Sequence, residues 1–351
     1  MSTDEDVPQV GITDQMALNL NILEQDPESL HLLNEMNHNI SKPQKELMLW
    51  HQRIAHMGFA WLQDLMQPGK NDVGEPTNPP FIPTKHTLTC RVEHPKCASC
   101  IIAKHHRRTP GSQVVISKPE REMAIRRDAA RPGDRVCVDQ FLSSKPGRLE
   151  NTYGKESDDD RYHGGTLFVD CALACIKLKL QISLRTGETL TGKHEFERFA
   201  SLHGVTIKKY RADNHPFSSA EFKADIELLD QELDFSGVGA HFQNGVAERA
   251  IQTVTYWSRA MLLHQMRKWP EAWDEALWPF ALEQAVYLWN NLPRSRSGLT
   301  PLKLFTGTKQ APNSVLSNAR VWGCPAYVLD PKLQDGHKLP KWKKRSRLHC
   351  P

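Results

Sequence analysis

Strand-like and helix-like sequence patterns alternate from about residue 133 to residue 291, and this alternation restricts the fold classes open to the chain. Short runs rich in β-branched and aromatic residues favour strands, and longer segments with apolar residues three or four apart favour helices. Strands followed by helices around one sheet are typical of an α/β fold. We expect strands at 134–142, 165–174, 175–184, 205–212 and 233–237, a polar loop at 143–165, and helices at 188–203, 218–230, 244–267 and 271–291.

Composition and sequence pattern argue against a membrane protein and against a secreted one. Of the 351 residues, 39% are hydrophobic and 25% are charged, as in ordinary globular proteins. No run approaches the roughly 18 apolar residues of a membrane span, and the acidic N-terminus lacks the features of a secretory signal. The net charge of +4 does not by itself indicate nucleic-acid binding, but the basic clusters at 104–108 and 338–347 favour contacts with phosphate.

Three acidic residues have the placement that a two-metal phosphoryl-transfer site needs. Asp139 and Asp213 each end a strand-like run, where ligands commonly bind in open α/β sheets. Glu248 falls in the first turn of a long predicted helix that Asn244 can cap. Mg²⁺ prefers carboxylate ligands, and two cations would offset the repulsion among three negative charges. Asp170, a competing acid in another strand-like run, is assigned a structural role.

A second set of residues, ahead of this region, has the composition of a tetrahedral zinc site. It combines two histidines with a C-x₂-C pair: His51, His56, Cys97 and Cys100. The histidines lie about one and a half helical turns apart in a helix that we predict at 45–66. Two imidazoles and two thiolates complete the ligand shell of a structural Zn²⁺ ion. Cys90 and His94 lie nearby, so the sequence leaves the choice of ligands open.

Several short motifs occur in a fixed order along the chain. They are WHQRIAH at 50–56, CASC at 97–100, RADN at 211–214, QNGVAER at 243–249 and VWGCPAY at 321–327. Together they resemble the integrase region of copia-type LTR retrotransposon polyproteins, over about residues 45–347. The resemblance implies an RNase H-like fold, in which helices flank a mixed β-sheet, with a small helical zinc-binding N-terminal domain. It also implies two Mg²⁺ or Mn²⁺ ions per active site, held by the catalytic residues Asp139, Asp213 and Glu248, and one structural Zn²⁺.

The resemblance also implies an order of regions and a set of partners. We expect a disordered leader at 1–44, a zinc-binding pre-integrase domain at 45–110, an RNase H-like catalytic core at 124–300 and a truncated basic C-terminal region at 315–351. The implied partners are double-stranded DNA, as element ends and as target, and further copies of the chain in a homo-multimer on DNA, with no membrane. The implied location is the nucleus, with a cytoplasmic particle stage. Expected DNA contacts are Asn244, Gln252, Arg259, Lys341, Lys343, Lys344 and Arg345.

The function implied by the resemblance is joining of a DNA 3′-hydroxyl end to target DNA by a strand transferase, with two alternatives. The family generally has Gly after the Asp-Asn of its second acid motif, whereas this chain has His215 and Pro216. Pro fixes φ and removes a backbone donor, which favours a catalytically inactive nucleic-acid-binding protein that retains the fold. An RNase H-type nuclease that cleaves without joining is the other alternative.

Overall fold

The computed structural model describes residues 37, 39–70, 76–104, 131–150, 160–213, 217–235, 245–294, 298–308 and 319–349. The predicted leader at 1–44 lies almost entirely outside these residues. Among the helices that are described, none combines the length and the apolar composition that crossing a membrane requires.

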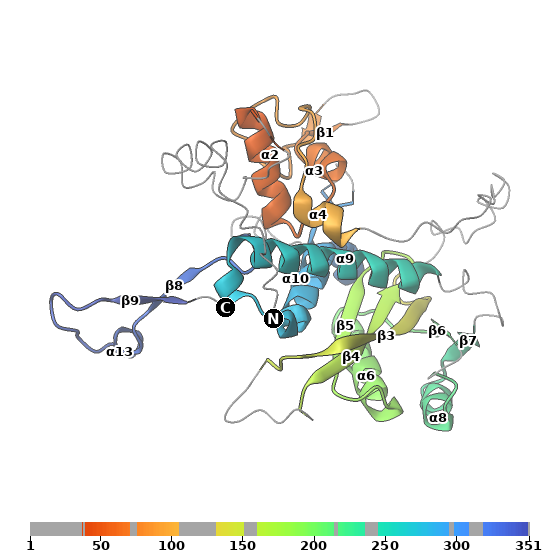
Figure 1. The fold of residues 1–351 in the computed structure, drawn as a ribbon. Helices are drawn as coiled ribbons and strands as arrows, with labels where there is room; N and C mark the ends of the chain where they lie inside the picture. Colours follow the sequence, from red (N-terminus) through yellow and green to blue (C-terminus); the bar gives the residue numbers. More distant parts are fainter. Residues whose placement is uncertain are drawn as a thin grey trace, which may run out of the picture.

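The centre of the fold is a five-stranded mixed sheet (Figure 1). Its strands are β3 (Val136–Gly147), β4 (Tyr162–Asp170), β5 (Ile176–Gln181), β6 (Lys209–Ala212) and β7 (Glu232–Phe235). In the order β5-β4-β3-β6-β7, the first three strands are antiparallel neighbours, whereas β6 runs parallel to β3 and to β7. This is an RNase H-like sheet, so the predicted α/β fold class is confirmed.

Helices cover both faces of the sheet. They are α6 (Thr186–Leu202), α8 (Ala220–Leu228), α9 (Gly245–Lys268) and α10 (Trp278–Asn291), followed by the short α11 (Pro301–Thr306). Helices α6 and α8 pack on the face that contains Val138 and Ala212. Helices α9 and α10 pack on the face that contains Cys137 and Val169. Because alternate strand residues share a face, Asp139 points to the α9 side.

The strand that carries Asp139 is longer than predicted. The sequence pattern predicted a strand end at 142 and a polar loop at 143–165, but β3 continues to Gly147 and pairs with Tyr162 of β4 after a register shift. An antiparallel hairpin can expose polar residues to water on one side, which is why polarity wrongly indicated a loop. Asp139 therefore lies inside a strand and not at its end.

Helix α10 also starts later than predicted. Two 3₁₀ turns, η4 (Pro270–Ala272) and η5 (Glu275–Leu277), occupy the first part of the helix expected at 271–291. The side chain of Asp274 accepts a hydrogen bond from the backbone N–H of Ala276 and caps the second turn. The apolar periodicity extended through these turns, so it did not locate the boundary.

Three short helices form the N-terminal region, and the first two of them replace the single helix predicted at 45–66. They are α2 (Lys42–Arg53), α3 (Phe59–Leu65) and α4 (Ala98–Ala103), beside a small sheet of β1 (Gly69–Lys70) and β2 (Pro76–Asn78). The prediction is wrong because Ala55 and His56 adopt left-handed φ angles of 45° and 56°. On an unbroken helix, residues five apart would lie about 140° apart around the axis. The break places His56 beside His51.

The C-terminal region is a two-stranded hairpin that extends away from the rest of the protein (Figure 1). It comprises β8 (Ala326–Leu329), α13 (Pro331–Gln334) and β9 (Ser346–His349). The predicted strand at 321–329 is thus shorter than expected. Tyr327 and Trp342 are 79% and 92% exposed, so the sides of the arm on which they lie have little packing.

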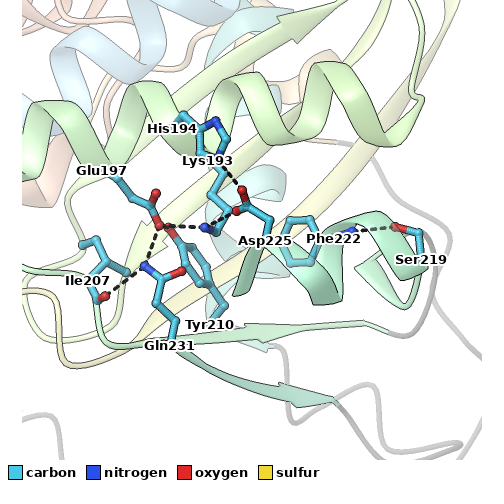
Figure 2. A network of polar contacts seen from close by, with 9 residues as sticks. All are labelled: Lys193, His194, Glu197, Ile207, Tyr210, Ser219, Phe222, Asp225 and Gln231. Carbon is cyan, nitrogen blue, oxygen red and sulfur yellow. Dashed lines mark hydrogen bonds and ion pairs between the residues drawn. The ribbon is translucent and has the colours of Figure 1, made fainter. Parts of the chain in front are cut away.

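A buried polar network ties β6 and α8 to α6 (Figure 2). Lys193 is fully buried, and its Nζ lies 2.9 Å from Glu197 and 2.6 Å from Asp225. The hydroxyl of Tyr210 donates to Glu197, and Lys193 also lies 5.3 Å from the centre of the Tyr210 ring. The amide of Gln231 donates to Glu197 as well. One buried cation thereby links α6 and α8 to β6, the strand that leads to Asp213.

Replacing Lys193 with Met should destabilise the fold by about 3 kcal/mol or more, because two carboxylates then lose their cation in a largely buried site. The matched control is Lys179→Met. Its ion pair with Glu195 has a similar length of 2.6 Å but more exposed side chains, so the expected loss is at most about 1 kcal/mol. Urea unfolding of both variants measures the difference, and equal losses would contradict the assigned role of Lys193.

Candidate active site and metal centre

Two of the predicted acids come together through strand register. Val138 of β3 pairs with Ala212 of β6 in parallel register, so the next residues, Asp139 and Asp213, lie at the same level of neighbouring strands. Neighbouring strands are about 4.8 Å apart, which brings the two carboxylates within reach of a shared site. Both side chains are partly buried.

The third acid approaches from the helix that covers this face. Glu248 lies in the first turn of α9, and its side chain is exposed. The flanking residues Ala247 and Ala250 are 0% and 4% exposed and belong to the core shared with the sheet. Small residues at these two positions let the helix lie close to β3 and β4, which it contacts. Glu248 thus stands at the rim of the surface that contains the two aspartates.

The electrostatics of Asp139 link the three carboxylates. The pKa of Asp139 is raised to about 6, mainly by burial and in part by the negative charges of Glu248 and Asp213, while a hydrogen bond from the backbone N–H of Gln140 lowers it. Like charges act in this way only over short distances. The donors are hard oxygens, so this set fits Mg²⁺ or Mn²⁺.

The raised pKa of Asp139 predicts a pH dependence of stability in the metal-free protein. The folded chain holds this proton more tightly than the unfolded chain, so ionisation of Asp139 destabilises the fold. This loss of stability is absent below the ordinary pKa of 3.8 and complete above about 6. Asp139→Asn should therefore be more stable than the wild type near neutral pH, by up to about 3 kcal/mol. Below about pH 4 the two proteins should be equally stable. Urea unfolding across this range tests it, and a pH-independent difference would refute it.

The four predicted zinc ligands form a compact cluster. Their ligand atoms all lie within 4.8 Å of one another: those of His51, His56, Cys97 and Cys100. Among the described residues, no other group of three or more His, Cys, Asp or Glu side chains lies close enough together to hold one ion. The carboxylates of Asp139, Asp213 and Glu248 are therefore farther apart than the ligand atoms of this cluster.

The spacing within this cluster fits a tetrahedral ion. The Sγ of Cys97 lies 3.4 Å from Nδ1 of His56, and the Sγ of Cys100 lies 3.3 Å from Nε2 of His51. The two histidine nitrogens are 3.2 Å apart. Ligand atoms around a tetrahedral Zn²⁺ are about 3.3 to 3.8 Å apart, given the usual Zn–N and Zn–S bond lengths. The cluster therefore fits zinc in both chemistry and size.

Surrounding groups orient the histidines. Nδ1 of His51 lies 2.7 Å from the carbonyl oxygen of Met57, a partner that fixes the proton on Nδ1 and leaves Nε2 for a metal. Burial lowers the pKa of His56, which favours the neutral ring that metals bind. The alternative ligands are engaged elsewhere: Cys90 donates to the carbonyl of Thr87, and His94 bonds to Gln63.

Asp170 has the structural role expected for it. It is fully buried, and its carboxylate accepts hydrogen bonds from the backbone N–H groups of Gly133 and Leu173. These bonds fix the turn between β4 and β5 and the entry to β3. Asp170 therefore belongs to the scaffold and not to the acid site.

The predicted DNA contacts on α9 share one exposed face with Glu248. Gln252 lies one turn further along, and its amide donates to the hydroxyl of Tyr256 at 2.9 Å. The guanidinium of Arg259 lies 5.9 Å from the Tyr256 ring and donates to the carbonyl of Ala103 at the end of α4. Tyr256 was not placed on this face from the sequence, although it lies four residues after Gln252 and eight after Glu248, a spacing that indicates neighbours on a helix.

The remaining predicted contacts divide into two groups. Lys341, Lys343, Lys344 and Arg345 are exposed on the C-terminal arm, around Trp342. Asn244 lies outside the described residues, as do His215 and Pro216 beside Asp213.

Several solved structures are similar to this chain. Two forms of the HTLV-2 integrase catalytic core domain in complex with magnesium, dimeric and trimeric, are each 18% identical, with a TM-score of 0.34. Each match covers 50% of this chain and 97% of that domain. The simian T-cell lymphotropic virus intasome in complex with the PP2A regulatory subunit B56 gamma is 15% identical, with a TM-score of 0.38, over 63% of this chain and 68% of that one. No protein-family model and no curated protein matches the sequence.

Proposed function

We propose that this chain is a DNA strand transferase of the integrase type, derived from a copia-type LTR retrotransposon. The observation that carries the proposal is the placement of Asp139 and Asp213 at one level of neighbouring strands, below the helix whose first turn holds Glu248. The motif around Glu248, QNGVAER at 243–249, supports the same assignment.

The three acids share one task in this reaction, which is to hold the metal ions. Asp139, Asp213 and Glu248 would hold two Mg²⁺ or Mn²⁺ ions, which supply an activated nucleophile and a stabilised leaving oxygen. The 3′-oxygen of a DNA end attacks a target phosphorus, and the bond from that phosphorus to the target 3′-oxygen breaks. Asp139, whose pKa is raised, must lose its proton to act as a ligand. The N-terminus of α9 favours nearby phosphate through the helix dipole.

The rest of the protein supports assembly on DNA in this proposal. His51, His56, Cys97 and Cys100 would hold one structural Zn²⁺ ion. The partners are double-stranded DNA, as element ends and as target, and further copies of the chain in a homo-multimer on that DNA. The reaction would occur in the nucleus, after a cytoplasmic particle stage.

A joining assay tests the proposal. Purified protein is incubated with a labelled DNA end that has a free 3′-hydroxyl and with plasmid, in Mg²⁺ or Mn²⁺, and label covalently joined to plasmid is the expected product. Cleavage without joining would indicate a nuclease. DNA binding without either reaction would indicate the second candidate, an inactive binding protein. His215 and Pro216 in the sequence after Asp213 favour this candidate, because Pro fixes φ and lacks a backbone donor.

Neutralising the C-terminal arm should reduce the salt dependence of DNA binding. Each lost phosphate contact lowers the slope of log affinity against log salt by about 0.9. We expect a reduction of up to about 2.7 for the combined Gln variant of Lys343, Lys344 and Arg345. Fluorescence anisotropy over a salt series measures it. The control variant neutralises Lys208 and Lys223, which are exposed near the five-stranded sheet. If the arm variant and the control variant have the same slope, the arm does not contact DNA.

A further inference from the structure

The N-terminal region (α2, α3 and α4) and helix α9, which carries Glu248, have residues in one hydrophobic core. Leu47, Met57 and Leu62 of the N-terminal region are fully buried in the same cluster as Val254 and Trp257 of α9. This cluster also includes residues of β3, β4 and α10. A module that folded separately would have a core of its own and contact α9 through a mainly polar surface. Here the packing is continuous from Ile54, Ala55 and Met57, the neighbours of His56 in the chain, to the sheet.

Helix α4 forms the most direct contact. It begins after Cys97, contains Cys100, and lies against α9 (Figure 1). At its end, the carbonyl of Ala103 accepts a hydrogen bond of 3.2 Å from the guanidinium of Arg259. On the other side of the cluster, the ring of the ligand His56 lies 5.1 Å from the ring of His264 on α9. Two of the four ligands are therefore linked closely to α9: Cys100 through α4, in which it lies, and His56 through His264.

A row of tryptophans makes a second contact between the same parts. Trp61 of α3 lies 6.0 Å from Trp257 of α9, which lies 5.9 Å from Trp289 of α10. The indole N–H of Trp61 donates to the carbonyl of Pro293 at 2.9 Å. The guanidinium of Arg294 lies 3.3 Å above the Trp289 ring and 5.3 Å from that of Trp61. The region thus contacts both helices of this face.

We propose that metal bound by the four His and Cys ligands positions α9, and through α9 the carboxylate of Glu248. The identity of the metal as zinc and the role of Glu248 rest on the proposed function. Helix α9 is one continuous element of 24 residues, so a shift at Trp257, Arg259 or His264 is transmitted to its first turn. Carboxylates that share metal ions need placement to within about 1 Å, which makes Glu248 sensitive to such shifts.

Hydrogen exchange of the full chain, with zinc removed and then restored, tests this proposal. Zinc should slow amide exchange in peptides covering 245–256, none of which contains a zinc ligand, by about tenfold, as is typical of coupled sites. Protection confined to 42–66 and 97–104 would overturn the proposal. This readout needs neither DNA nor catalysis, so a chain that fails to join DNA can still show the coupling, and an active chain can lack it.

A variant on the α9 side tests the same link in the reverse direction. Coupling between two sites is reciprocal, so Arg259→Met should weaken zinc affinity, measured against a chromophoric chelator, and reduce the zinc-dependent protection of 245–256. Gln252→Met is the matched control, because Gln252 is exposed on the same helix and its hydrogen bond is to Tyr256. If the two variants have equal zinc affinity and equal zinc-dependent protection of 245–256, Arg259 does not couple the zinc cluster to α9.

Discussion

Glu248→Gln is expected to reduce DNA joining by at least about 1,000-fold, a barrier increase of roughly 4 kcal/mol. Gln has the shape of Glu but no charge, and its amide oxygen is a much weaker ligand for Mg²⁺ or Mn²⁺. Stability should change little, because Glu248 is exposed. The loss of a neighbouring negative charge should also lower the pKa of Asp139, which is raised in part by Glu248.

Glu221→Gln is the control for this experiment. Glu221 is also an exposed glutamate in the first turn of a helix, α8, but it lies on the opposite face of the sheet. The joining assay should show wild-type activity for this variant. Comparable activity of the Glu248 and Glu221 variants would refute the proposed acid site.

Cys97→Ser is expected to remove zinc and to cost at least about 4 kcal/mol of apparent folding stability in zinc-containing buffer. Structural zinc sites in small domains supply more than that, but here Leu47, Met57 and Leu62 also bury apolar surface, which limits the loss. Without the metal, the buried cluster of thiols and imidazoles has nothing to balance its desolvation. The contacts of α4 and of His56 with α9 should then weaken.

Metal analysis and urea unfolding check this expectation together. The wild type should contain about one zinc per chain, and the variant none. Cys90→Ser is the matched control, since Cys90 bonds to the carbonyl of Thr87 and lies outside the ligand cluster. A wild-type protein that is fully folded and free of metal would contradict the zinc assignment.

Local sequence patterns predicted the elements of the core better than the contacts between them. β-Branched residues indicated β3 and β6, because such residues favour strands, although Val205, Thr206 and Ile207 lie just before β6, which begins at Lys209. The parallel pairing of Val138 with Ala212 joins strands far apart in the sequence, and no local pattern specifies it. Asp213 was proposed from the RADN motif at 211–214 and Asp139 from its position in a strand, but their equal level on neighbouring strands needed the structure.

Buried charge was beyond the reach of the sequence for a different reason. Lys193 lies in an amphipathic helical pattern, where a lysine ordinarily faces water. Its full burial depends on Glu197, Asp225 and Tyr210, which come from three different elements. In contrast, residue type and order predicted the four side chains that form the His and Cys cluster, although the helix geometry inferred for His51 and His56 was wrong.

The two left-handed residues at Ala55 and His56 set two conformations of one segment against each other. A left-handed backbone conformation costs each non-glycine residue about 1–2 kcal/mol. The apolar periodicity of 45–66 also favours an uninterrupted helix. A newly made chain without metal should therefore extend α2 through this point and turn His56 away from His51. Zinc uptake would then convert helix into turn, so the helix content of the whole chain, measured by far-ultraviolet circular dichroism, should fall on metal binding, the reverse of the usual behaviour of small zinc domains.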